Sequence, residues 1–580
     1  MRIAHRRVKN NSKEHRVVTL SYSSGPASAG LLGDTIAGNF AAQTEKTPNL
    51  QALVDLPTGR SWTYAELDQD ADRLAAALME RGLKKGDRLG IFAQNIPEWV
   101  LTMYAAAKLG VIIVNINPAY REHELEFILE HSGATMLISQ VSAPPHIDFV
   151  EVSRAVAAKL ENLSVVYVDT SHETTATPMK QHEIAPEEKF SALLEAGERL
   201  LADEGAKVRT RIRQITDTLS CDEPINLQYT SGTTGFPKGV TLTHHNILNN
   251  GYLIGETLAY TEEDTVVLPV PFFHCFGMVI GILAAFSHGS TAVIPSAGFD
   301  PSAALSAVEK TKATSLYGVP TMFIAELELS NFDDYDLSTL RTGVMAGSTC
   351  PVEVMRAVIE RMHMSEVAIC YGMTETAPVS TMTRVDDSLE ARTETVGTVM
   401  PHTEVKVVDP VTGETLPRGQ KGEVCTRGYC VMKGYWNQPD KTAEVLDADG
   451  WMHTGDLGIM NEAGYLDISG RIKDMVIRGG ENVYPREIEE FLYTHPSIRD
   501  VQVVGVPDPK YGEELMAWVI LREGVETLTA EDVREFAQGK LAHYKIPRYV
   551  EVRESFPMTV SGKIRKVELR AEGAEIVSAG

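Results

Sequence analysis

Residues 229–239 carry the kinds of group that could hold a chain of phosphates. The segment reads Tyr-Thr-Ser-Gly-Thr-Thr-Gly-Phe-Pro-Lys-Gly, with three glycines, four serine or threonine hydroxyls and one lysine. Glycine lets backbone N–H groups turn toward an anion, the hydroxyls donate hydrogen bonds, and Lys238 adds a positive charge. Apolar and polar residues alternate on both sides of the segment. We therefore predict an anion-binding loop between two strands.

The order of residues in this loop argues against a Walker A loop, in which the lysine follows the last glycine and a helix comes next. Here Lys238 precedes Gly239 and a strand pattern follows. A glycine-rich surface turn would not need so many donors. The segment resembles the signature of the AMP-forming acyl-adenylate ligases, the superfamily of acyl-CoA synthetases, luciferases and the adenylation domains of peptide synthetases. The resemblance implies that these residues bind ATP: Thr230, Ser231, Gly232, Thr233, Thr234, Gly235 and Lys238.

A second motif, Tyr371-Gly372-Met373-Thr374-Glu375, ends an apolar, strand-like run. It matches the Tyr-Gly-x-Thr-Glu pattern of the same superfamily. The resemblance implies that Glu375 coordinates a Mg²⁺ ion that bridges the phosphates, as hard oxygen ligands do, and that Thr374 bonds the α-phosphate. We include both as candidate catalytic residues. The residues expected to border the nucleotide are Tyr371, Gly372, Gly347 and Ser348.

Asp456 and Arg471 are candidates for binding the ribose. Three other residues are candidates for catalysis by the mobile domain, for its hinge and for the CoA tunnel. Asp456 in Thr-Gly-Asp looks like the family's ribose ligand, with Arg471 supporting the same sugar; a turn aspartate and a surface arginine are the alternatives. Lys563, in Ser-Gly-Lys, matches the family's catalytic lysine on its mobile domain, although an exposed tail lysine would look the same. Lys473 matches the hinge position, and Gly480 would face the pantetheine tunnel of CoA.

The segment after Pro271 predicts the binding site for the acid. Amino-acid-activating domains normally place a carboxylate there, whereas this chain has His274, which we include as a candidate catalytic residue. Gly277 and Gly281 would share one face of a helix, either for close packing or for a ligand channel, and the resemblance favours the channel. The expected apolar pocket consists of Phe276, Met278, Val279, Val319, Met322 and Met345. Such a pocket suits a medium- to long-chain fatty acid.

The predicted function is ATP-dependent conversion of a fatty acid to acyl-AMP with release of pyrophosphate, followed by transfer of the acyl group to CoA. ATP, Mg²⁺, CoA and a small carboxylic acid are the implied cofactors and partners. The alternatives are an aryl- or other carboxylate-CoA ligase, an acyl-AMP ligase that loads a carrier protein, and a non-catalytic adenylate-binding homologue. We expect no carrier-protein segment after the last domain, and no insertion is evident near Lys473. Filled key positions disfavour the non-catalytic homologue.

Alternating helix and strand patterns predict an α/β fold with parallel strands. A helix should open at Thr63, strands should end near Gly318, Gly347 and Thr374, and short strands after Gly397 predict a small β subdomain. The polar stretch 170–223 is expected to be a surface excursion. The expected domains are a disordered tail over residues 1–30, a large N-terminal adenylate-forming domain over 31–471, and a small mobile C-terminal α+β domain over 472–580.

Composition limits the possible partners and location. The 580 residues are 43% hydrophobic and 23% charged, with a formal net charge of -25, which argues against nucleic acid as a partner. The sequence shows no long uncharged apolar run that predicts a transmembrane segment. Six dispersed cysteines are expected to be reduced core residues. We expect a cytoplasmic enzyme, or a mitochondrial matrix enzyme if the basic N-terminus is a transit peptide, with a homodimer left open.

Overall fold

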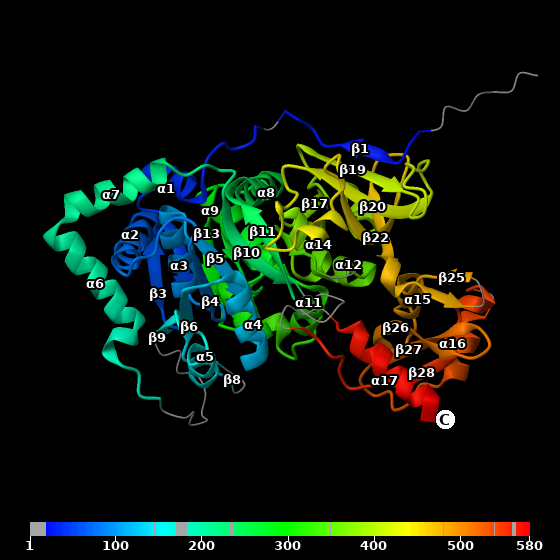
Figure 1. The fold of residues 1–580 in the computed structure, drawn as a ribbon. Coiled ribbons are helices and arrows are strands. Elements are labelled where there is room, and N and C mark those ends of the chain that lie inside the picture. Colours follow the sequence, from blue (N-terminus) through cyan, green and yellow to red (C-terminus); the bar gives the residue numbers. More distant parts are fainter. Residues whose placement is uncertain are drawn as a thin grey trace, which may run out of the picture.

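The computed structural model describes residues 19–28, 30–143, 147–169, 182–230, 237–347, 350–478, 481–538, 540–559 and 564–579. Two bodies of unequal size are visible, and the orange and red C-terminal elements gather apart from the rest of the chain (Figure 1). The larger body contains two long mixed sheets and a smaller antiparallel sheet. This arrangement agrees with the predicted α/β class and with the small β subdomain.

The first long sheet carries the strands on either side of the predicted anion loop. Its order is β21-β11-β10-β5-β4-β6-β9, and the run from β10 to β9 is parallel, whereas β11 pairs antiparallel with both of its neighbours. The strands are β4 (Arg88–Phe92), β5 (Ile112–Ile116), β6 (Met136–Gln140), β9 (Ser164–Val168), β10 (Pro224–Thr230), β11 (Lys238–Thr243) and β21 (Gly434–Tyr435). The predicted strands at 89–93 and 111–115 are confirmed.

The second long sheet has the order β18-β17-β16-β15-β14-β12-β13-β2-β3, with parallel pairing from β16 to β2. Its strands are β2 (Gln51–Asp55), β3 (Arg60–Thr63), β12 (Thr265–Val267), β13 (Thr291–Ile294), β14 (Ser315–Gly318), β15 (Thr342–Met345), β16 (Glu366–Gly372), β17 (Val379–Met382) and β18 (Thr398–Val399). Because β14, β15 and β16 are parallel neighbours, their carboxyl ends lie at one edge of the sheet.

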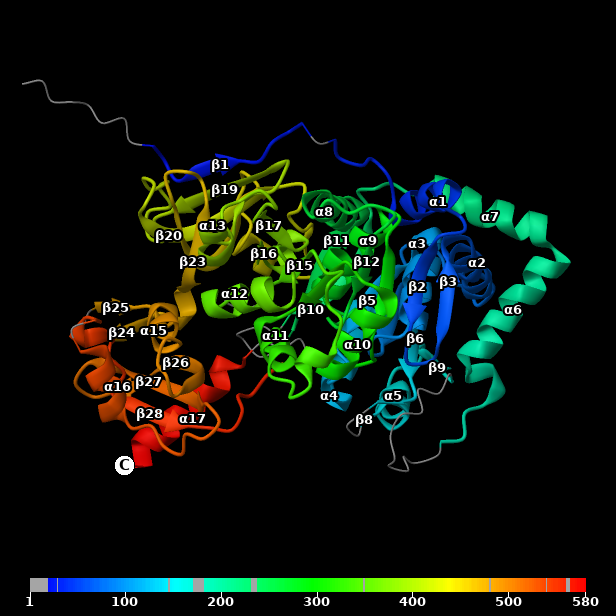
Figure 2. The same cartoon turned by 180° about the vertical axis from the view of Figure 1, so that it is seen from behind.

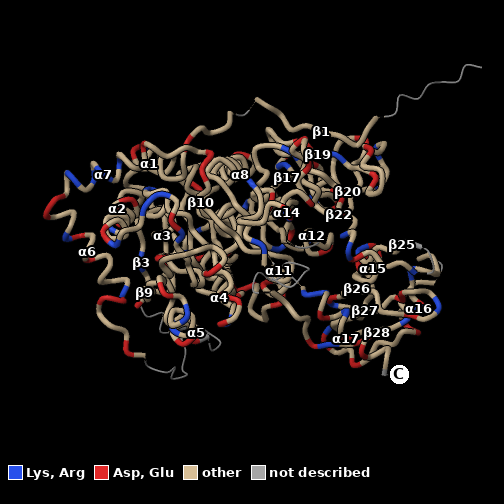
Figure 3. Tube along the Cα trace, in the orientation of Figure 1, with Lys and Arg blue, Asp and Glu red and all other residues tan. Residues whose placement is uncertain are grey.

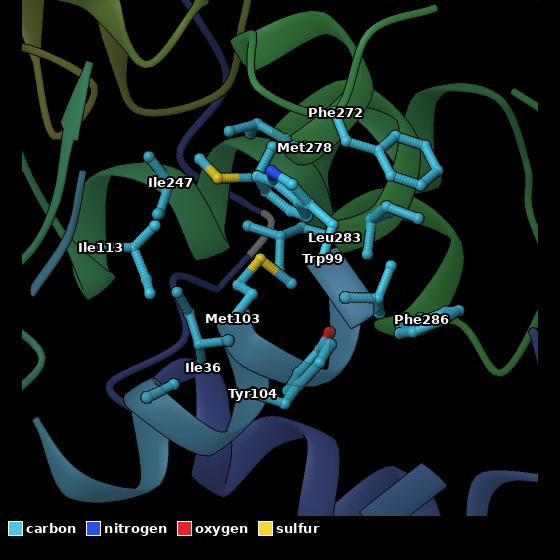
Figure 4. Packing of buried hydrophobic residues seen from close by; sticks show 14 of the residues in the cluster. Ile36, Trp99, Met103, Tyr104, Ile113, Ile247, Phe272, Met278, Leu283 and Phe286 are labelled. Atoms are coloured by element: carbon cyan, nitrogen blue, oxygen red, sulfur yellow. The ribbon is translucent and has the colours of Figure 1, made fainter. Parts of the chain in front are cut away.

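The two long sheets share one hydrophobic core, which includes Ile113 of β5 and Val266 of β12. Helix α3 (Pro97–Leu109) is buried along its whole length, as expected for a helix that is apolar on all sides. Figure 4 shows Trp99 and Met103 of α3 gathered with Met278. Helix α2 (Tyr64–Glu80) begins where predicted, because Thr63 and Glu66 bond each other's backbone N–H groups in a capping box.

The remaining helices of the larger body cover the sheets. They are α1 (Ile36–Lys46), α4 (Glu122–Ser132), α5 (Phe149–Ala157), α6 (Phe190–Asp203), α7 (Gly205–Asp217), α8 (His244–Thr257), α9 (Ala284–Phe286), α10 (Pro301–Thr311), α11 (Pro320–Leu327), α12 (Val352–Arg361), α13 (Leu389–Glu394) and α14 (Pro439–Ala443). Figure 2 shows α6 and α7 running along one side of the body, beyond α2. Helix α6 rests on α2 so closely that a Cβ atom at Gly197 would lie 1.8 Å from the Arg73 carbonyl oxygen.

The smaller antiparallel sheet has the order β1-β19-β20-β22-β23 and forms the predicted β subdomain. Its strands are β1 (Tyr22–Ser24), β19 (Thr403–Val408), β20 (Lys421–Gly428), β22 (Met452–Met460) and β23 (Leu466–Arg471). The predicted disordered tail over residues 1–30 is wrong at β1, because Tyr22 pairs with Lys406 and Ser24 with Glu404. A partner strand almost four hundred residues away gives no local signal. Residues 1–18 lie outside the described part.

The C-terminal body begins after β23, at the short 3₁₀ turn Ile472–Asp474. Its sheet contains β24 (Val476–Arg478), β25 (Glu481–Val483), β26 (Ile498–Asp508), β27 (Gly512–Leu521) and β28 (Tyr549–Val552). Its helices are α15 (Pro485–Leu492), α16 (Ala530–Ala537) and α17 (Lys566–Ala579). These elements match the predicted small α+β unit. Contacts between the two bodies include the Lys421 ammonium, 3.6 Å from the Tyr484 ring centroid, and Arg486, which pairs with Asp467 at 3.4 Å.

Charged side chains of both signs are mixed along the chain rather than gathered into one basic face (Figure 3). No helix within the described ranges is long and apolar enough to cross a membrane. All six cysteines are free; Cys275, Cys425 and Cys430 are buried, as expected of core residues, whereas Cys221, Cys350 and Cys370 are half-buried.

Candidate active site

The candidate site lies where the strands β14, β15 and β16 end side by side. Gly318 pairs with Met345, and Met345 with Ile369, so the polar segments that follow these residues leave the same edge of the sheet. In open α/β sheets ligands bind at the carboxyl ends of the strands. Gly347 follows β15 with a positive φ of 94°, a backbone conformation that favours glycine. The predicted convergence of the three strand ends is confirmed.

Asp456 is held by two of the residues predicted to lie around the nucleotide. The Tyr371 hydroxyl donates to one carboxylate oxygen at 2.8 Å, and Nε of Arg471 donates to the other at 3.1 Å. Asp456 is only 6% exposed, whereas 64% of the Arg471 side chain is exposed. Burial, and then the Asp456 charge, raises the pKa of Tyr371, and the same carboxylate raises the pKa of Arg471. The structure therefore brings this predicted group together.

Glu375 occupies a second anionic position, beside the predicted loop lysine. The hydroxyl of Tyr435 donates to Oε1 of Glu375 at 2.8 Å, and the ammonium of Lys238 lies 4.6 Å from the centroid of the same tyrosine ring. The backbone N–H of Met432 donates to the Glu375 carbonyl at 2.9 Å. Burial, and then the Glu375 charge, raises the pKa of Tyr435. The Glu375 carboxylate and the Lys238 ammonium thus both contact the side chain of Tyr435.

Thr374 and Gly372 shape the turn that carries Glu375. Thr374 starts a single 3₁₀ turn and is 8% exposed. A Cβ atom at position 372 would lie 1.8 Å from the Pro378 carbonyl oxygen, so the turn can close only on a glycine. The role of Gly372 is therefore to let the backbone pass closely, which places Thr374 and Glu375 at the sheet edge.

The predicted loop begins and ends on two paired strands. Thr230 at the end of β10 pairs with Lys238 at the start of β11, which confirms the strand-loop-strand arrangement. Several predicted site residues lie outside the described ranges, and their roles remain predictions: Ser231, Gly232, Thr233, Thr234, Gly235, Ser348, Gly480 and Lys563.

His274 lies at the turn before the π-helix Phe276–Leu283. Its Nδ1 accepts a hydrogen bond from the Phe276 backbone N–H at 3.1 Å, so this nitrogen satisfies the first N–H group of the helix. Gly277 and Gly281 are closely packed. Added Cβ atoms would lie 2.3 Å from the Pro271 carbonyl oxygen and 2.9 Å from the Leu268 side chain, respectively. At these two glycines the structure shows close packing, and the channel remains a prediction.

The residues of the predicted acid pocket are buried, and all but one of them belong to the same hydrophobic core. Phe276, Met278, Val279, Val319 and Met322 belong to the core that joins the two long sheets. Met345 belongs to a separate cluster, whereas its neighbour Val344 belongs to the shared core. Successive side chains of a strand point to opposite faces of the sheet, so the predicted strand was correct but the chosen face of β15 was not.

The junction between the two bodies lies near Lys238 of the predicted phosphate loop. Lys473 is part of the 3₁₀ turn Ile472–Asp474, and Arg570 of α17 pairs with Asp474 at 3.1 Å. The pKa of Glu444, after α14, is lowered first by a hydrogen bond from Lys441 and further by the charges of Lys238 and Lys473. The loop lysine and the predicted hinge lysine therefore act on the same carboxylate.

Models of two known protein families match most of this chain. A family model described as AMP-binding enzyme matches residues 40–436, and one described as AMP-binding enzyme C-terminal domain matches residues 487–563. The chain belongs to the AMP-binding enzyme family. Thr374, Glu375 and Tyr435 lie in the first matched range, Lys563 ends the second, and Asp456 and Arg471 lie between the two.

This AMP-binding enzyme is similar to named relatives over nearly its full length. It is 46% identical to the putative acyl-CoA synthetase YngI of Bacillus subtilis, over 94% of this chain and 98% of the relative. It is 41% identical to the mitochondrial medium-chain acyl-CoA ligase ACSF2 of Rattus norvegicus, over 95% of this chain and 90% of the relative. The anthranilate CoA ligase AuaEII, solved with anthranoyl-AMP, superposes with a TM-score of 0.80 at 26% identity, covering 96% of this chain and all of AuaEII.

Sequence reasoning missed two residues that organise the site of this AMP-binding enzyme. Tyr435 holds Glu375, and Glu423 holds the turn before Asp456 by accepting hydrogen bonds from the Gly455 N–H at 3.1 Å and from His453 at 2.9 Å. Both lie on strands that contribute to the site only through pairing with distant segments. A local clue to Tyr435 was the glycine that precedes it. Gly434 has a positive φ of 139°, where the chain changes direction just before Tyr435.

Proposed function

We propose that this AMP-binding enzyme is an acyl-CoA synthetase that activates a medium- to long-chain fatty acid. The observation that carries the proposal is that β16 ends in Tyr371, which bonds Asp456, and leads directly to Glu375, which shares the side chain of Tyr435 with Lys238. The Asp456 carboxylate suits the sugar hydroxyls, the Glu375 carboxylate suits a metal ion on the phosphates, and the Lys238 ammonium suits a free phosphate oxygen. The names of the two relatives, one an acyl-CoA synthetase and one a medium-chain acyl-CoA ligase, support the same activity.

ATP would bind with its ribose on Asp456 and its adenine beside Tyr371 and Gly347. A buried carboxylate can accept hydrogen bonds from two neighbouring ribose hydroxyls, and Arg471 fixes its orientation. Lys238 and the preceding loop would hold the outer phosphates, which become the pyrophosphate leaving group. The net charge of -25 makes such local positive groups necessary for binding a polyphosphate.

The residues around Glu375 fit a magnesium ion. Its Oε1 accepts the Tyr435 hydrogen bond, its Oε2 would bind the hard cation, and the Thr374 hydroxyl is next to it in the chain. Bound Mg²⁺ would neutralise charge on the phosphates of ATP. Glu375 would hold the ion, and Tyr435 and the Met432 N–H would keep Glu375 in place.

The reaction would proceed in two displacements. A carboxylate oxygen of the acid attacks the α-phosphorus, forming the acyl-AMP bond as the bond to pyrophosphate breaks. The sulfur of CoA then attacks the acyl carbon, and AMP leaves with the former carboxylate oxygen. Lys563 would stabilise the charge that develops in the first step, and motion at Lys473 would open the route for CoA past Gly480. Lys563→Ala should abolish adenylation and spare thioester formation from supplied acyl-AMP.

The fatty-acid assignment rests on the buried residues near the strand ends. Phe276, Met278, Val319 and Met322 offer an apolar lining. Methionine adapts its shape, which suits a flexible chain. An aryl acid is the second candidate, because the structurally similar AuaEII is named an anthranilate CoA ligase.

A panel of acids tests this proposal. Acetate, octanoate, palmitate, benzoate, anthranilate and glycine are each supplied with ATP and Mg²⁺, with and without CoA, and pyrophosphate and thioester are measured. We expect octanoate or palmitate to give the highest kcat/KM, with pyrophosphate released in both conditions and thioester only with CoA. Preference for benzoate or anthranilate would replace the fatty-acid assignment with the aryl one. Pyrophosphate release with none of the acids would contradict the enzyme proposal.

A further inference from the structure

Tyr435 touches both charged groups of the phosphate site through different parts of one side chain. Its hydroxyl donates to Oε1 of Glu375 at 2.8 Å, while its ring lies 4.6 Å from the ammonium of Lys238. A phenol hydroxyl is a good donor to a carboxylate, and the face of the ring attracts a cation. The two opposite charges are therefore each satisfied by the tyrosine.

The backbone around Tyr435 is fixed on several sides. Its N–H donates to the Thr442 hydroxyl at 2.9 Å, and the next residue, Trp436, donates its N–H to the Gly239 carbonyl at 2.7 Å. Tyr435 pairs with Val240 of β11, the strand that starts at Lys238. Only 6% of the tyrosine is exposed. The backbone that carries the ring is therefore tied to β11.

The same short segment also holds the backbone of Glu375, because the Met432 N–H donates to the Glu375 carbonyl at 2.9 Å. Glu375 is thus restrained at both its main chain and its carboxylate by residues 432–435. An ammonium and a carboxylate in a partly dehydrated site attract each other strongly. If Lys238 and Glu375 joined directly, neither would be free for a phosphate or a cation.

We propose that Tyr435 is a positioning residue that keeps Glu375 directed toward the metal and Lys238 directed toward the phosphates. This inference rests on the proposed function, since it assumes that ATP binds with Mg²⁺ at Glu375. In this role Tyr435 acts through Glu375 and Lys238 rather than on the phosphates or the acid. Its hydroxyl acts on the metal ligand and its ring acts on the lysine, so the two effects are separable by mutation.

The test is the binding of a non-hydrolysable α,β-methylene analogue of ATP, measured by calorimetry with Mg²⁺ and with a chelator. Tyr435→Phe removes the hydroxyl and keeps the ring. We expect it to lose about tenfold of the affinity measured with Mg²⁺, from the loss of one hydrogen bond to a charged group, and to match the wild type in the chelator. Tyr435→Leu also removes the ring, and it should bind more weakly in both conditions.

Two further variants separate positioning from loss of the fold. Thr442→Val removes the acceptor for the Tyr435 N–H with little change of shape, and it should lower the affinity with Mg²⁺ in the same direction by a smaller factor. Tyr429→Phe is the matched control, because it removes the hydroxyl of a half-buried tyrosine, which accepts a hydrogen bond from the Asn250 amide at 3.2 Å. Its binding should equal that of the wild type.

Steady-state kinetics give an independent measure. Tyr435→Phe should raise the KM for Mg-ATP by about tenfold and leave kcat within about twofold, because the groups that touch the reacting atoms are intact. Equal affinity of Tyr435→Phe and wild type in the presence of Mg²⁺ would overturn this inference and leave the proposed function standing. Failure of the wild type to bind the analogue would contradict the proposed function itself.

Discussion

The Tyr371 hydroxyl donates a hydrogen bond to Asp456 across 2.8 Å, joining the end of β16 to β22 of the small antiparallel sheet. The two residues are 85 positions apart in the chain. Arg471 donates to the other oxygen of the same carboxylate. The predicted adenine and ribose positions are therefore one physical unit, in which the orientation of Asp456 is fixed from two sides.

Replacing Asp456 by asparagine should weaken ATP binding strongly. The amide cannot accept on both atoms, so the Arg471 and Tyr371 bonds and those expected from the ribose cannot all be made. Hydrogen bonds to charged groups contribute about 1.5–3 kcal/mol, which predicts a rise of roughly tenfold to a hundredfold in the KM for ATP. Tyr371→Phe should give a smaller rise in the same direction. The measurement is initial rate against ATP concentration at saturating acid.

The control for Tyr371→Phe is Tyr465→Phe, because Tyr465 also donates to an aspartate, Asp387, at 2.6 Å, away from the strand ends. It should leave the KM for ATP unchanged. A rise as large as that of Tyr371→Phe would show that the loss of any such pair disturbs the fold, and would remove the support for a ribose role.

The contacts between the two bodies should restrain the turn that joins them. Tyr484→Ala combined with Arg486→Ala removes the ring under Lys421 and the ion pair with Asp467. Each contact contributes about 0.5–1 kcal/mol, so loss of both should raise the population of loosened molecules several-fold. We expect faster trypsin cleavage at Lys473, followed by mass spectrometry of the fragments.

The matched control for this pair is Tyr511→Ala, which removes a ring near Lys510 and Arg478 inside the small domain. Its cleavage at Lys473 should proceed at the wild-type rate. Unchanged cleavage in the double variant would mean that Tyr484 and Arg486 do not restrain the junction.

Buried His244 should make the large domain less stable in acid. Burial lowers the pKa of His244 from 6.5 to about 3, and its Nδ1 accepts a hydrogen bond from the Ile36 N–H at 3.2 Å. Between pH 6.5 and about 3, His244 binds a proton in the unfolded chain but not in the folded chain. The contribution of His244 is thus complete above pH 6.5 and falls by about 1.4 kcal/mol per unit as pH drops toward 3.

The check is the thermal midpoint of the protein between pH 7 and pH 5. His244→Gln should flatten its dependence on pH, since this histidine accounts for roughly 2 kcal/mol over that interval. His123→Gln, at an exposed position of α4, is the surface control. Equal slopes in all three proteins would contradict the role of His244.

The two glycines of the π-helix should differ in their tolerance of a methyl group. Gly277→Ala places a Cβ atom against a fixed backbone oxygen, whereas Gly281→Ala meets the movable end of Leu268. Overpacking costs about 1–3 kcal/mol, so Gly277→Ala should lower the thermal midpoint more. If both variants kept the wild-type midpoint and changed only the acid preference, the glycines would line a channel after all.

Local patterns in the sequence were enough to place many elements. Thr63 and Glu66 predicted the start of α2, and the polar residues after three apolar runs predicted the strand ends at the site. These features depend on neighbours in the chain, such as capping groups and strand alternation. The phosphate-loop pattern also located the hairpin between Thr230 and Lys238.

What the sequence did not reveal depends on contacts between distant segments. Tyr22 joins the sheet through Lys406, and Tyr435 reaches Glu375 only because β21 pairs with β11. Met345 was assigned to the wrong face, since alternation alone does not say which face of a doubly covered strand meets which core. Each of these errors concerns pairing or facing, which tertiary structure decides.

The measurement that tests the central claim most directly follows oxygen through the reaction. Octanoate labelled with ¹⁸O in its carboxylate is incubated with the enzyme, ATP, Mg²⁺ and CoA, and the nucleotide product is analysed by mass spectrometry. Attack of the carboxylate on the α-phosphorus predicts AMP that carries one ¹⁸O atom, together with octanoyl-CoA and pyrophosphate. Formation of octanoyl-CoA with unlabelled AMP, or with ADP and phosphate, would contradict the acyl-adenylate route.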